Sequence, residues 1–455
     1  MPEFGTSGLR GLAVDLTDDL VGRYAAAFVA QHGAGGPLYV GQDKRDSSPR
    51  LAAAVARGAA DEGVDVVDCG VLPTPALALA AQKAGTIAIM ITGSHIPADR
   101  NGLKFYTRAG EFTKADEAPL ADAVAERAAP KGPLPDVEEN ADAREAYIAR
   151  YVEGIPTDAL RGARVGVWMH SSAAGEVLPA ILGALGADVV PLGSSSAFVP
   201  VDTEAVDTET RAQLAAWVKA EKLDALVSTD GDADRPLLVD DQGQVVPGDI
   251  LGPITAGWCG ATGVVTTVSA NTLVDLMETF EVSRTKIGSP YVIAEMEARG
   301  SGVVGYEPNG GFLLGWDLAD GEKRLSTLMT RDAMLPLLAV IAASRDVGSI
   351  SGMLAAYPER RTATDRLKDI PRDKSLALVD RLLRGDLSVL PDGLGALVNT
   401  DTTDGARLSF DSGRVVHIRP SGNAPELRCY VEAESSAAAS EVLTAAMDNL
   451  RSALA

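Results

Sequence analysis

The sequence predicts an α/β protein made of three related, mostly parallel α/β domains in series and a C-terminal α+β domain. Short apolar segments alternate with alanine-rich segments of helical period, which is typical of β-α-β units. This rhythm restarts roughly every hundred residues. The chain has 455 residues, which is too long for a single hydrophobic core.

The first three domains are expected at residues 1–135, 136–247 and 248–356. Short apolar, β-branched runs bounded by turn residues predict their strands, at 38–41, 64–70, 86–91, 164–169, 186–192, 224–228, 263–268 and 302–305. A helix is expected at 48–62, and another ends near Leu185. Strands that alternate with helices in this way indicate doubly wound sheets.

The last domain, 357–455, differs because its apolar segments are separated by short turns. We expect antiparallel strands at 405–410, 413–419 and 426–433 and a closing helix at 437–454. Proline-containing linkers are expected at 129–138 and near 357–358.

The net charge of −22 argues against nucleic-acid and membrane-surface binding, so an anionic substrate would need a few placed Arg and Lys residues. Cys69, Cys259 and Cys429 are far apart and form no metal or disulfide pattern. No signal peptide and no apolar run of membrane-spanning length is found. We expect a cytoplasmic protein.

Asp230, Asp232 and Asp234 alternate with small residues directly after a predicted strand. Three neighbouring carboxylates repel one another unless a cation lies between them, which favours a hard divalent metal such as Mg²⁺ and phosphoryl chemistry. An EF-hand is excluded, because Arg235 and Asp241 occupy the positions that need Gly and Glu. A solvated acidic turn is the alternative.

Four further loops contain candidate chemistry. Ser94, at the end of a predicted strand, is expected to be exposed for attack, with an N-cap as the alternative, and Lys104 lies downstream. The other three loops can bind phosphate or sugar hydroxyls, although each can also be a plain turn or flexible segment; they are residues 5–11, 305–311 and 419–425.

Taken together and in this order, these five loops resemble the α-D-phosphohexomutase family over the whole chain. The resemblance implies four domains around a central cleft. It implies that Ser94 carries the phosphoryl group with His95 beside it, that Arg10 lies near the reacting phosphate, and that Lys104 neutralises it. Its implied Mg²⁺ ligands are Ser94, Asp230, Asp232 and Asp234.

The resemblance also implies a substrate-binding set, which comprises Thr6, Ser7, Arg235, Lys286, Glu307, Asn309, Arg419, Ser421, Gly422, Asn423 and Arg428. The sequence departs from the family pattern at several loop positions. Asn309 replaces the usual Ser, and Gly311 replaces the His of some members. Ile96 replaces the usual Asn, and Asn423-Ala424 replaces the usual Thr-Glu. These departures bear on the choice of sugar.

The implied reaction is reversible phosphoryl transfer between C6 and C1 of a hexose phosphate, through phosphoserine and a hexose 1,6-bisphosphate. Mannose 6-phosphate is the favoured substrate, and glucose phosphate is the alternative. A Mg²⁺-dependent phosphatase or a non-catalytic sugar-phosphate sensor would be consistent with the same loops. The general base is expected to be His95 or Lys104, and the protein a monomer or homodimer.

Overall fold

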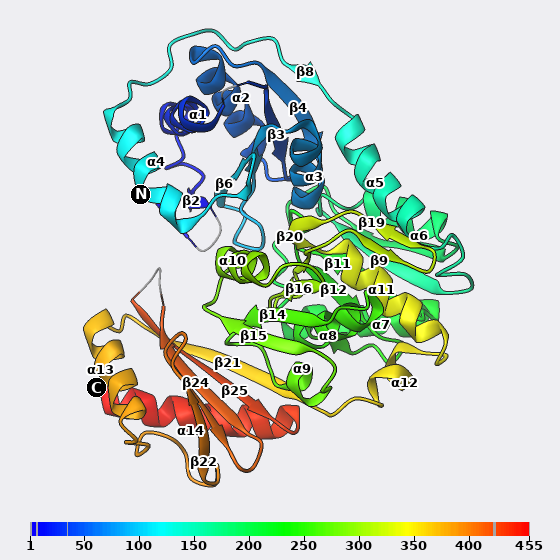
Figure 1. The fold of residues 1–455 in the computed structure, drawn as a ribbon, viewed down its shortest axis with the longest axis vertical. Coiled ribbons are helices and arrows are strands. Elements are labelled where there is room, and N and C mark those ends of the chain that lie inside the picture. The colour runs from blue at the N-terminus through cyan, green and yellow to red at the C-terminus, as the bar shows by residue number, and fades with distance from the viewer. Residues whose placement is uncertain (1, 6–7, 34, 422–424, 455) are drawn as a thin grey trace.

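The structure is a computed structural model that describes residues 2–5, 8–33, 35–421 and 425–454. Four large sheets with their covering helices form an arc, in which the first and last domains lie at opposite ends (Figure 1), and the third domain also contains a two-stranded sheet of β18 and β19. The predicted fold class is confirmed: three mixed α/β sheets precede one antiparallel sheet. No described helix is long and apolar enough to cross a membrane.

The first sheet has the order β1-β2-β6-β5-β3-β4-β8, with β7 beside β6. Its strands are β1 Glu3–Phe4, β2 Leu9–Leu12, β3 Leu38–Gln42, β4 Val66–Val71, β5 Ile87–Ile91, β6 Arg100–Thr107, β7 Gly110–Glu111 and β8 Glu138–Glu139. Its helices are α1 Asp18–His32, α2 Ser48–Asp61, α3 Thr74–Ala84 and α4 Lys114–Glu126. The strands β5, β3, β4 and β8 are parallel, whereas β6, β2 and β1 are antiparallel to their neighbours.

The second sheet, β10-β9-β11-β12-β13, and the third, β15-β14-β16-β17-β20, each begin with three parallel strands and end with antiparallel ones. The second domain contains α5 Asp142–Gly154, β9 Arg164–His170, α6 Val177–Ala184, β10 Asp188–Ser194, α7 Thr208–Glu221, β11 Ala225–Thr229, β12 Pro236–Val239 and β13 Val245–Val246. The third contains α8 Gly248–Trp258, β14 Gly263–Thr267, α9 Leu273–Leu276, β15 Glu281–Thr285, α10 Ser289–Arg299, β16 Val303–Tyr306, β17 Phe312–Leu314, β18 Leu318–Asp320, β19 Lys323–Leu325, β20 Leu328–Asp332, α11 Met334–Arg345 and α12 Ile350–Leu354.

The three α/β domains place their functional loops at equivalent positions. In each, a buried parallel strand ends in the loop and an antiparallel strand returns beside it, in the pairs β5/β6, β11/β12 and β16/β17. The returning strands were not predicted, because β6, β12 and β17 are short or follow polar loops. Three loops that are far apart in the sequence therefore lie at equivalent positions of their sheets.

The fourth sheet, β21-β25-β24-β23-β22, is antiparallel throughout. Its elements are β21 Arg361–Lys368, α13 Arg372–Leu383, β22 Leu397–Asp401, β23 Ala406–Phe410, β24 Val415–Pro420, β25 Glu426–Ala433 and α14 Ser436–Leu454. The apolar face of α14 packs on β21 and β25. This agrees with the strands and closing helix predicted from the turn-rich sequence.

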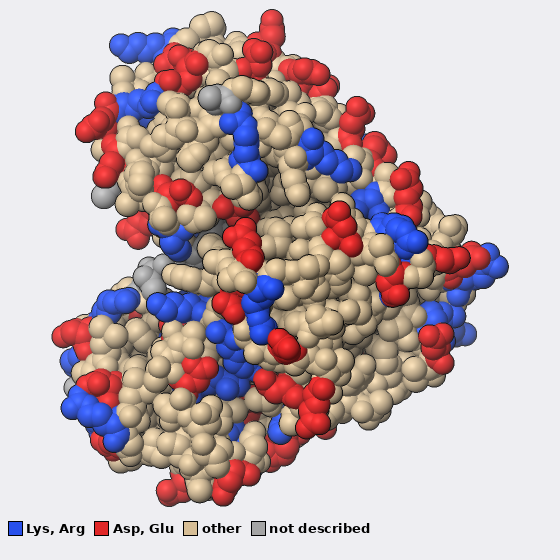
Figure 2. Space-filling model, viewed as in Figure 1, with Lys and Arg blue, Asp and Glu red and all other residues tan. Residues whose placement is uncertain are grey.

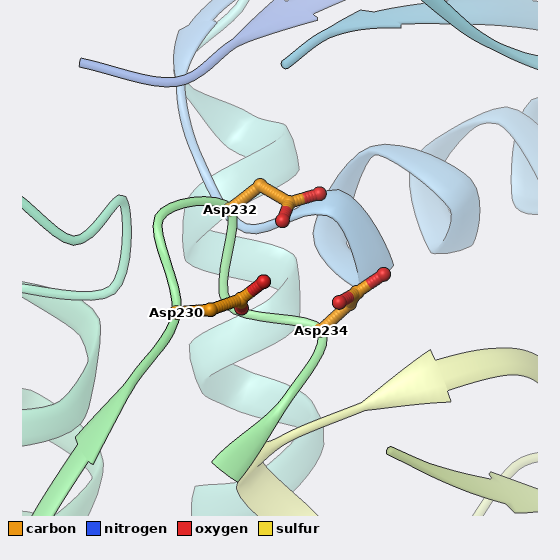
Figure 3. Close-up of side chains that lie close together, drawn as sticks. All are labelled: Asp230, Asp232 and Asp234. Carbon is orange, nitrogen blue, oxygen red and sulfur yellow. The ribbon is translucent and has the colours of Figure 1, made fainter. Parts of the chain in front are cut away.

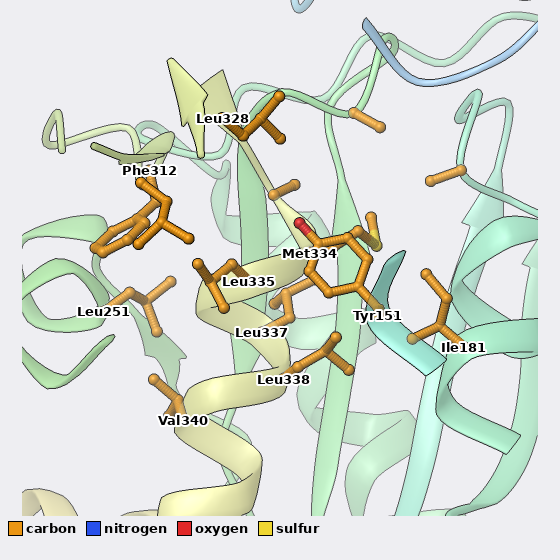
Figure 4. Packing of buried hydrophobic residues seen from close by; sticks show 14 of the residues in the cluster. Tyr151, Ile181, Leu251, Phe312, Leu328, Met334, Leu335, Leu337, Leu338 and Val340 are labelled. Atoms are coloured by element: carbon orange, nitrogen blue, oxygen red, sulfur yellow. The ribbon is translucent and has the colours of Figure 1, made fainter. Parts of the chain in front are cut away.

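Two kinds of core hold the molecule together. One apolar cluster joins the second and third domains and reaches into the first at Leu77. Figure 4 shows Tyr151, Leu251 and Leu335 of this cluster. The fourth domain has a cluster of its own, between its sheet and α13 and α14. The first three domains therefore share buried apolar surface, whereas the fourth is stabilised separately.

Candidate active site

Asp230, Asp232 and Asp234 lie in the loop between β11 and β12, and each is at most 1% exposed. Their carboxylates converge (Figure 3), with one oxygen from each lying within 4.8 Å of the others. The alternative of a solvated acidic turn is therefore wrong. A small residue is needed at Gly231, because a Cβ there would lie 2.8 Å from the carbonyl oxygen of Ser94.

Ser94 follows β5 and faces this acidic loop. Its hydroxyl donates to Asp230 Oδ2 at 2.5 Å and lies 3.3 Å from His95 Nδ1. The prediction that Ser94 is exposed is wrong: its exposure is 0%, because the acidic loop of the second domain covers it. The N-cap alternative is also wrong, since residues 93–99 form turns and bends and start no helix.

The turn that carries Ser94 is supported from beneath by Arg45, a residue that was not predicted from the sequence. Ser94 has a φ of 54°, in the left-handed region that few residues other than glycine adopt. The buried guanidinium of Arg45 donates at 2.6–2.9 Å to four backbone carbonyls of this turn, those of Ser94, Ile96, Pro97 and Arg100. Its ion pair with Asp43 is 3.1 Å long. The feature of the sequence that could have indicated Arg45 is the charged run that follows the predicted strand at 38–41.

Lys104 lies between two of the aspartates. It is on β6, where it pairs in register with Met90 of β5, and its ammonium donates to Asp232 Oδ2 at 2.5 Å and to Asp234 Oδ2 at 2.7 Å. The hydroxyl of Thr74, at the start of α3, donates to Asp232 Oδ2 at 2.5 Å. Two carboxylates of the second domain are thus held by side chains of the first.

The remaining oxygens of these two carboxylates are suited to a cation. Asp232 Oδ1 and Asp234 Oδ1 are buried and accept no hydrogen bond from the described residues. A buried carboxylate oxygen without a donor is costly, and a divalent cation removes that cost. Lys104 orients both groups through their other oxygens, as a supporting residue does around a metal ligand. The site therefore fits a hard divalent metal.

The charges around the site shift several pKa values. Burial, and then repulsion from Asp232 and Asp234, raises the pKa of Asp230 well above its usual value. Burial alone would lower the pKa of Lys104, but the two aspartates that it contacts outweigh this effect and raise it. Burial, and then the positive charges of nearby arginines, lowers the pKa of His95 far below its usual value. Lys104 is therefore charged and His95 neutral.

Two arginines lie beside the carboxylates with buried donors that are free to bind an anion. Arg10, on β2, is buried enough that its pKa falls to about 10, with a further contribution from Arg235. Arg235 Nε lies 3.7 Å from Asp234 Oδ1. Arg10 Nη2 and Arg235 Nε have no hydrogen-bond partner among the described residues. Unsatisfied guanidinium donors beside a metal site are well suited to phosphoryl oxygens.

The loop after β16 brings Glu307 and Asn309 to the same place. Both are buried, and Glu307 Oε2 accepts a hydrogen bond of 2.9 Å from Arg331 Nη1. Arg331 Nη2 also donates to Asp234 Oδ2 at 2.7 Å. The side-chain oxygen of Asn309 accepts from the backbone of Gly311 at 2.9 Å, so it is used within the loop. Arg331 was missed because nothing in its local sequence marks it.

The candidate phosphate loop lies between β24 and β25 in the fourth domain. Arg419, near the end of β24, forms an ion pair of 3.0 Å with Asp404, and Arg428 lies directly opposite Arg419 on β25. Ser421 is buried, and its backbone N–H donates to the Glu426 carbonyl at 2.8 Å. Arg428 is also paired with Glu426, at 3.4 Å, but its Nε is buried without a hydrogen-bond partner among the described residues and can therefore bind an anion.

Four predicted site residues, Thr6, Ser7, Gly422 and Asn423, lie outside the described residues. Lys286 is exposed, one residue before Ile287, whose N–H donates to Asp404 at 3.4 Å. Lys286 therefore lies where the third and fourth domains meet. Figure 2 shows the surface hollowed between the lobes of the first and fourth domains.

Comparisons with known proteins agree with this geometry. Four families match in order, described as phosphoglucomutase/phosphomannomutase alpha/beta/alpha domains I, II and III and the C-terminal domain. They match residues 1–130, 145–243, 249–360 and 371–449. A phosphoglucomutase/phosphomannomutase family protein of Burkholderia thailandensis has the same fold, with a TM-score of 0.78 at 22% identity over 98% of this chain and 97% of that one.

Two relatives named phosphomannomutase align along their length. The Sinorhizobium fredii protein is 43% identical over 100% of this chain and 99% of its own. The Salmonella muenchen protein is 40% identical over 99% of this chain and 96% of its own. The resemblance found from the five loops is confirmed, and the chain belongs to the phosphoglucomutase/phosphomannomutase family of phosphohexomutase enzymes.

Proposed function

We propose that the protein interconverts mannose 6-phosphate and mannose 1-phosphate by way of a phosphorylated Ser94 and a hexose 1,6-bisphosphate. The observation that carries this proposal is the 2.5 Å contact between the Ser94 hydroxyl and Asp230 within a buried group of three aspartates. A hydroxyl held against a metal-binding carboxylate, with two arginines and a lysine nearby, suits a residue that gains and loses a phosphoryl group.

In the first half-reaction the free hydroxyl of the substrate attacks the phosphorus of phospho-Ser94. The Oγ–P bond breaks, a bond from phosphorus to the sugar oxygen forms, and a base takes the proton of the sugar hydroxyl and returns it to Ser94 Oγ. In the second half-reaction the bisphosphate presents its other phosphate, the base takes the proton of the Ser94 hydroxyl as Oγ attacks that phosphorus, and the released sugar oxygen receives this proton. Positioning and charge neutralisation are the main demands of such a transfer.

His95 is the base in this proposal, and Lys104 remains an ammonium group. The aspartates raise the pKa of Lys104, so it is a poor proton acceptor and a good partner for phosphoryl oxygens. Burial and neighbouring arginines lower the pKa of His95 in the free protein. A phosphoryl group on Ser94 adds negative charge beside these arginines, which raises the pKa of His95 when a base is needed.

Asp230, Asp232 and Asp234, with an oxygen on Ser94, are the proposed ligands of one Mg²⁺ ion. When bound, Mg²⁺ supplies further stabilisation of the negative charge on the transferring group. Arg10 and Arg235 bind the other phosphoryl oxygens through their unsatisfied donors.

The substrate is held at both ends. Glu307 and Asn309, together with Lys286, contact the sugar, and Arg419, Ser421 and Arg428 hold the phosphate that does not react. Gly422 and Asn423 complete that phosphate site, and Thr6 and Ser7 contact the reacting phosphate. Because both ends of the bisphosphate are phosphates, one fixed site in the fourth domain serves both orientations of the intermediate.

The names of the two full-length relatives support mannose phosphate as the substrate. The proposed site is assembled from the four domains of one chain, so either a monomer or a homodimer can carry it. Cys69, Cys259 and Cys429 are free and buried, with pKa values raised to about 12 by burial. Unreactive free thiols suit the cytoplasm, where we place the reaction.

The proposal is tested by assaying the purified protein with mannose 1-phosphate, glucose 1-phosphate and glucosamine 1-phosphate, each with Mg²⁺ and a trace of the matching bisphosphate. The highest kcat/KM is expected with mannose 1-phosphate. Intact-mass analysis should find one added phosphate on the peptide that contains Ser94. Release of inorganic phosphate without isomerisation would instead indicate a phosphatase, and binding without turnover or phosphoserine would indicate a sensor.

A further inference from the structure

Arg331 connects two loops that belong to different domains. It lies on β20 of the third domain and is 4% exposed. Its Nη2 and Nε donate to Asp234 Oδ2 at 2.7 and 3.2 Å, and its Nη1 donates to Glu307 Oε2 at 2.9 Å. One planar guanidinium therefore orients a candidate metal ligand and a candidate sugar ligand at the same time.

The sugar loop is shaped around this side chain. A Cβ at position 311 would lie 2.7 Å from Arg331 Cδ, 2.9 Å from Arg331 Cγ and 3.0 Å from the Asp234 carbonyl oxygen. Only glycine therefore lets the arginine pass beneath the loop without a shift. The backbone of Gly311 also accepts from the Glu307 N–H at 3.1 Å, which holds the loop closed over the arginine.

The strand that carries Arg331 is anchored on both sides of it. The Thr330 hydroxyl donates to Glu111 Oε1 of the first domain at 2.5 Å. The carboxylate of Asp332 accepts hydrogen bonds from the hydroxyls of Tyr147 and Tyr151, which lie on α5. The position of Arg331 is therefore fixed before any ligand binds, as preorganisation of a site requires.

We propose that Arg331 is a positioning residue that couples the metal loop to the sugar loop. By holding Oδ2 of Asp234 it leaves Oδ1 of that carboxylate for the cation, and by holding Glu307 it presents the other carboxylate oxygen to the sugar hydroxyls. This inference rests on the proposed function. It adds the prediction that replacing Arg331 by a neutral residue changes the affinity for Mg²⁺ and the affinity for the hexose phosphate in opposite directions.

The opposite responses follow from electrostatics. Arg331 places a positive charge beside the metal ligands. Lys104 still holds Oδ2 of Asp234 at 2.7 Å when the arginine is removed, so little orientation of this ligand is lost and the loss of repulsion favours binding of a divalent cation. The same removal frees Glu307 to turn away from the sugar, which weakens binding of the hexose phosphate. A residue that merely stabilised the fold would weaken both binding events together.

The test measures binding of Mg²⁺ and of mannose 1-phosphate separately, by isothermal titration calorimetry with the full chain. For Arg331→Gln we expect Mg²⁺ to bind about three- to tenfold more tightly and mannose 1-phosphate to bind about tenfold more weakly. For Arg331→Lys, which keeps the charge but cannot span both carboxylates, we expect unchanged Mg²⁺ binding and weakened sugar binding. Arg324→Gln, on exposed β19 of the same domain, is the matched control and should behave as wild type.

Gly311→Ala gives a second route that leaves the arginine in place. Its methyl group must displace Arg331 or the loop, so it should weaken sugar binding in the wild-type background and do so much less in the Arg331→Gln background. Unchanged sugar binding in Arg331→Gln, or parallel weakening of Mg²⁺ and sugar, would overturn the inference. Both measurements are made without turnover, so they stay informative if the proposed mutase reaction itself is not found.

Discussion

The two ends of the candidate site are built in different ways. At the metal end, Ser94, Lys104 and the three aspartates come from two domains that share an apolar cluster with the third, and their side chains already contact one another. At the phosphate end, Arg419 and Arg428 lie opposite each other in a domain with its own core. The metal end is therefore preorganised, whereas we expect the phosphate end to be completed by the anion that it binds.

This difference predicts which kinetic constant each end controls. In the proposed reaction, groups at the metal end act on the reacting phosphoryl group, so their loss should lower kcat. The groups proposed at the phosphate end would hold a part of the substrate that does not change in each transfer step, so their loss should mainly raise KM. Substitutions at the metal end should therefore have the larger effects on turnover.

The substitution Ser94→Ala should abolish mutase turnover, with a loss of at least about a thousandfold in kcat, because no other described hydroxyl donates to the carboxylate of Asp230. The measurement is a coupled isomerase assay, with intact mass to verify that the variant carries no phosphate. Ser452→Ala on α14 is the matched control. Wild-type turnover by Ser94→Ala would remove the proposed mechanism.

The substitution Lys104→Met should lower kcat about a hundredfold, because it removes the buried ammonium that we propose neutralises the reacting phosphate. It also leaves Asp232 and Asp234 without their shared partner, so the metal-free variant should be less stable than wild type. Added Mg²⁺ should recover much of that stability, as judged by thermal unfolding with and without a chelator. A stability loss that Mg²⁺ does not reduce would show that the aspartates do not hold the ion.

The substitution Arg428→Gln should raise KM for mannose 1-phosphate about tenfold and change kcat much less. Arg428 is partly exposed and its ion pair with Glu426 is 3.4 Å long, so its removal should change the stability of the free protein little. Arg414→Gln, in the turn between β23 and β24 of the same domain, serves as the control. A fall in kcat as large as that of Lys104→Met would contradict the contrast between the two ends.

Asp249, where the third and fourth domains meet, gives a pH-dependent prediction. It is buried, its Oδ2 lies 3.5 Å from the Thr362 hydroxyl, and burial raises its pKa to about 7. Between its unfolded pKa and pH 7 the folded protein retains a proton that the unfolded chain has lost, so stability falls as pH rises through this window.

Replacement of Asp249 by Asn removes this titration. The melting temperature of Asp249→Asn minus that of wild type should rise by roughly 2–4 °C between pH 5 and pH 7.5. Above pH 7.5 this difference should stay constant. The measurement is thermal unfolding at several pH values, with Asp392→Asn, an exposed residue of the fourth domain, as the control. A difference in melting temperature between variant and wild type that is the same at every pH would mean that Asp249 does not titrate in this range.

Much of the fold could be predicted because its signals are local. The run Ile87–Ile91 is apolar throughout and is buried along its length in the centre of the first sheet. The turn-rich segments after Gly405 form three of the five strands of the antiparallel sheet, whereas β21 and β22, which precede them, were not predicted. The strand β6 was missed, because the residues at its start are polar and follow directly on a loop. That strand decides the position of Lys104.

The candidate residues with a distinctive neighbourhood were also predictable. Asp230, Asp232 and Asp234 form a pattern with few physical explanations, and Ser94 follows an apolar strand. Arg331 and Arg45 have no such pattern. Their roles depend on what packs against them: the acidic loop and Gly311 in one case, and a turn of the backbone with a left-handed serine in the other.

By itself, the sequence determined the four-domain α/β organisation, the five loops and the family, since periodicity, turn residues and short motifs are properties of neighbouring residues. Only the tertiary structure decided that Ser94 is buried against Asp230, 136 residues away in the chain, and that Arg331 joins two loops. The physical reason is that desolvation and charge pairing depend on distances in space, which the order of residues along the chain does not specify.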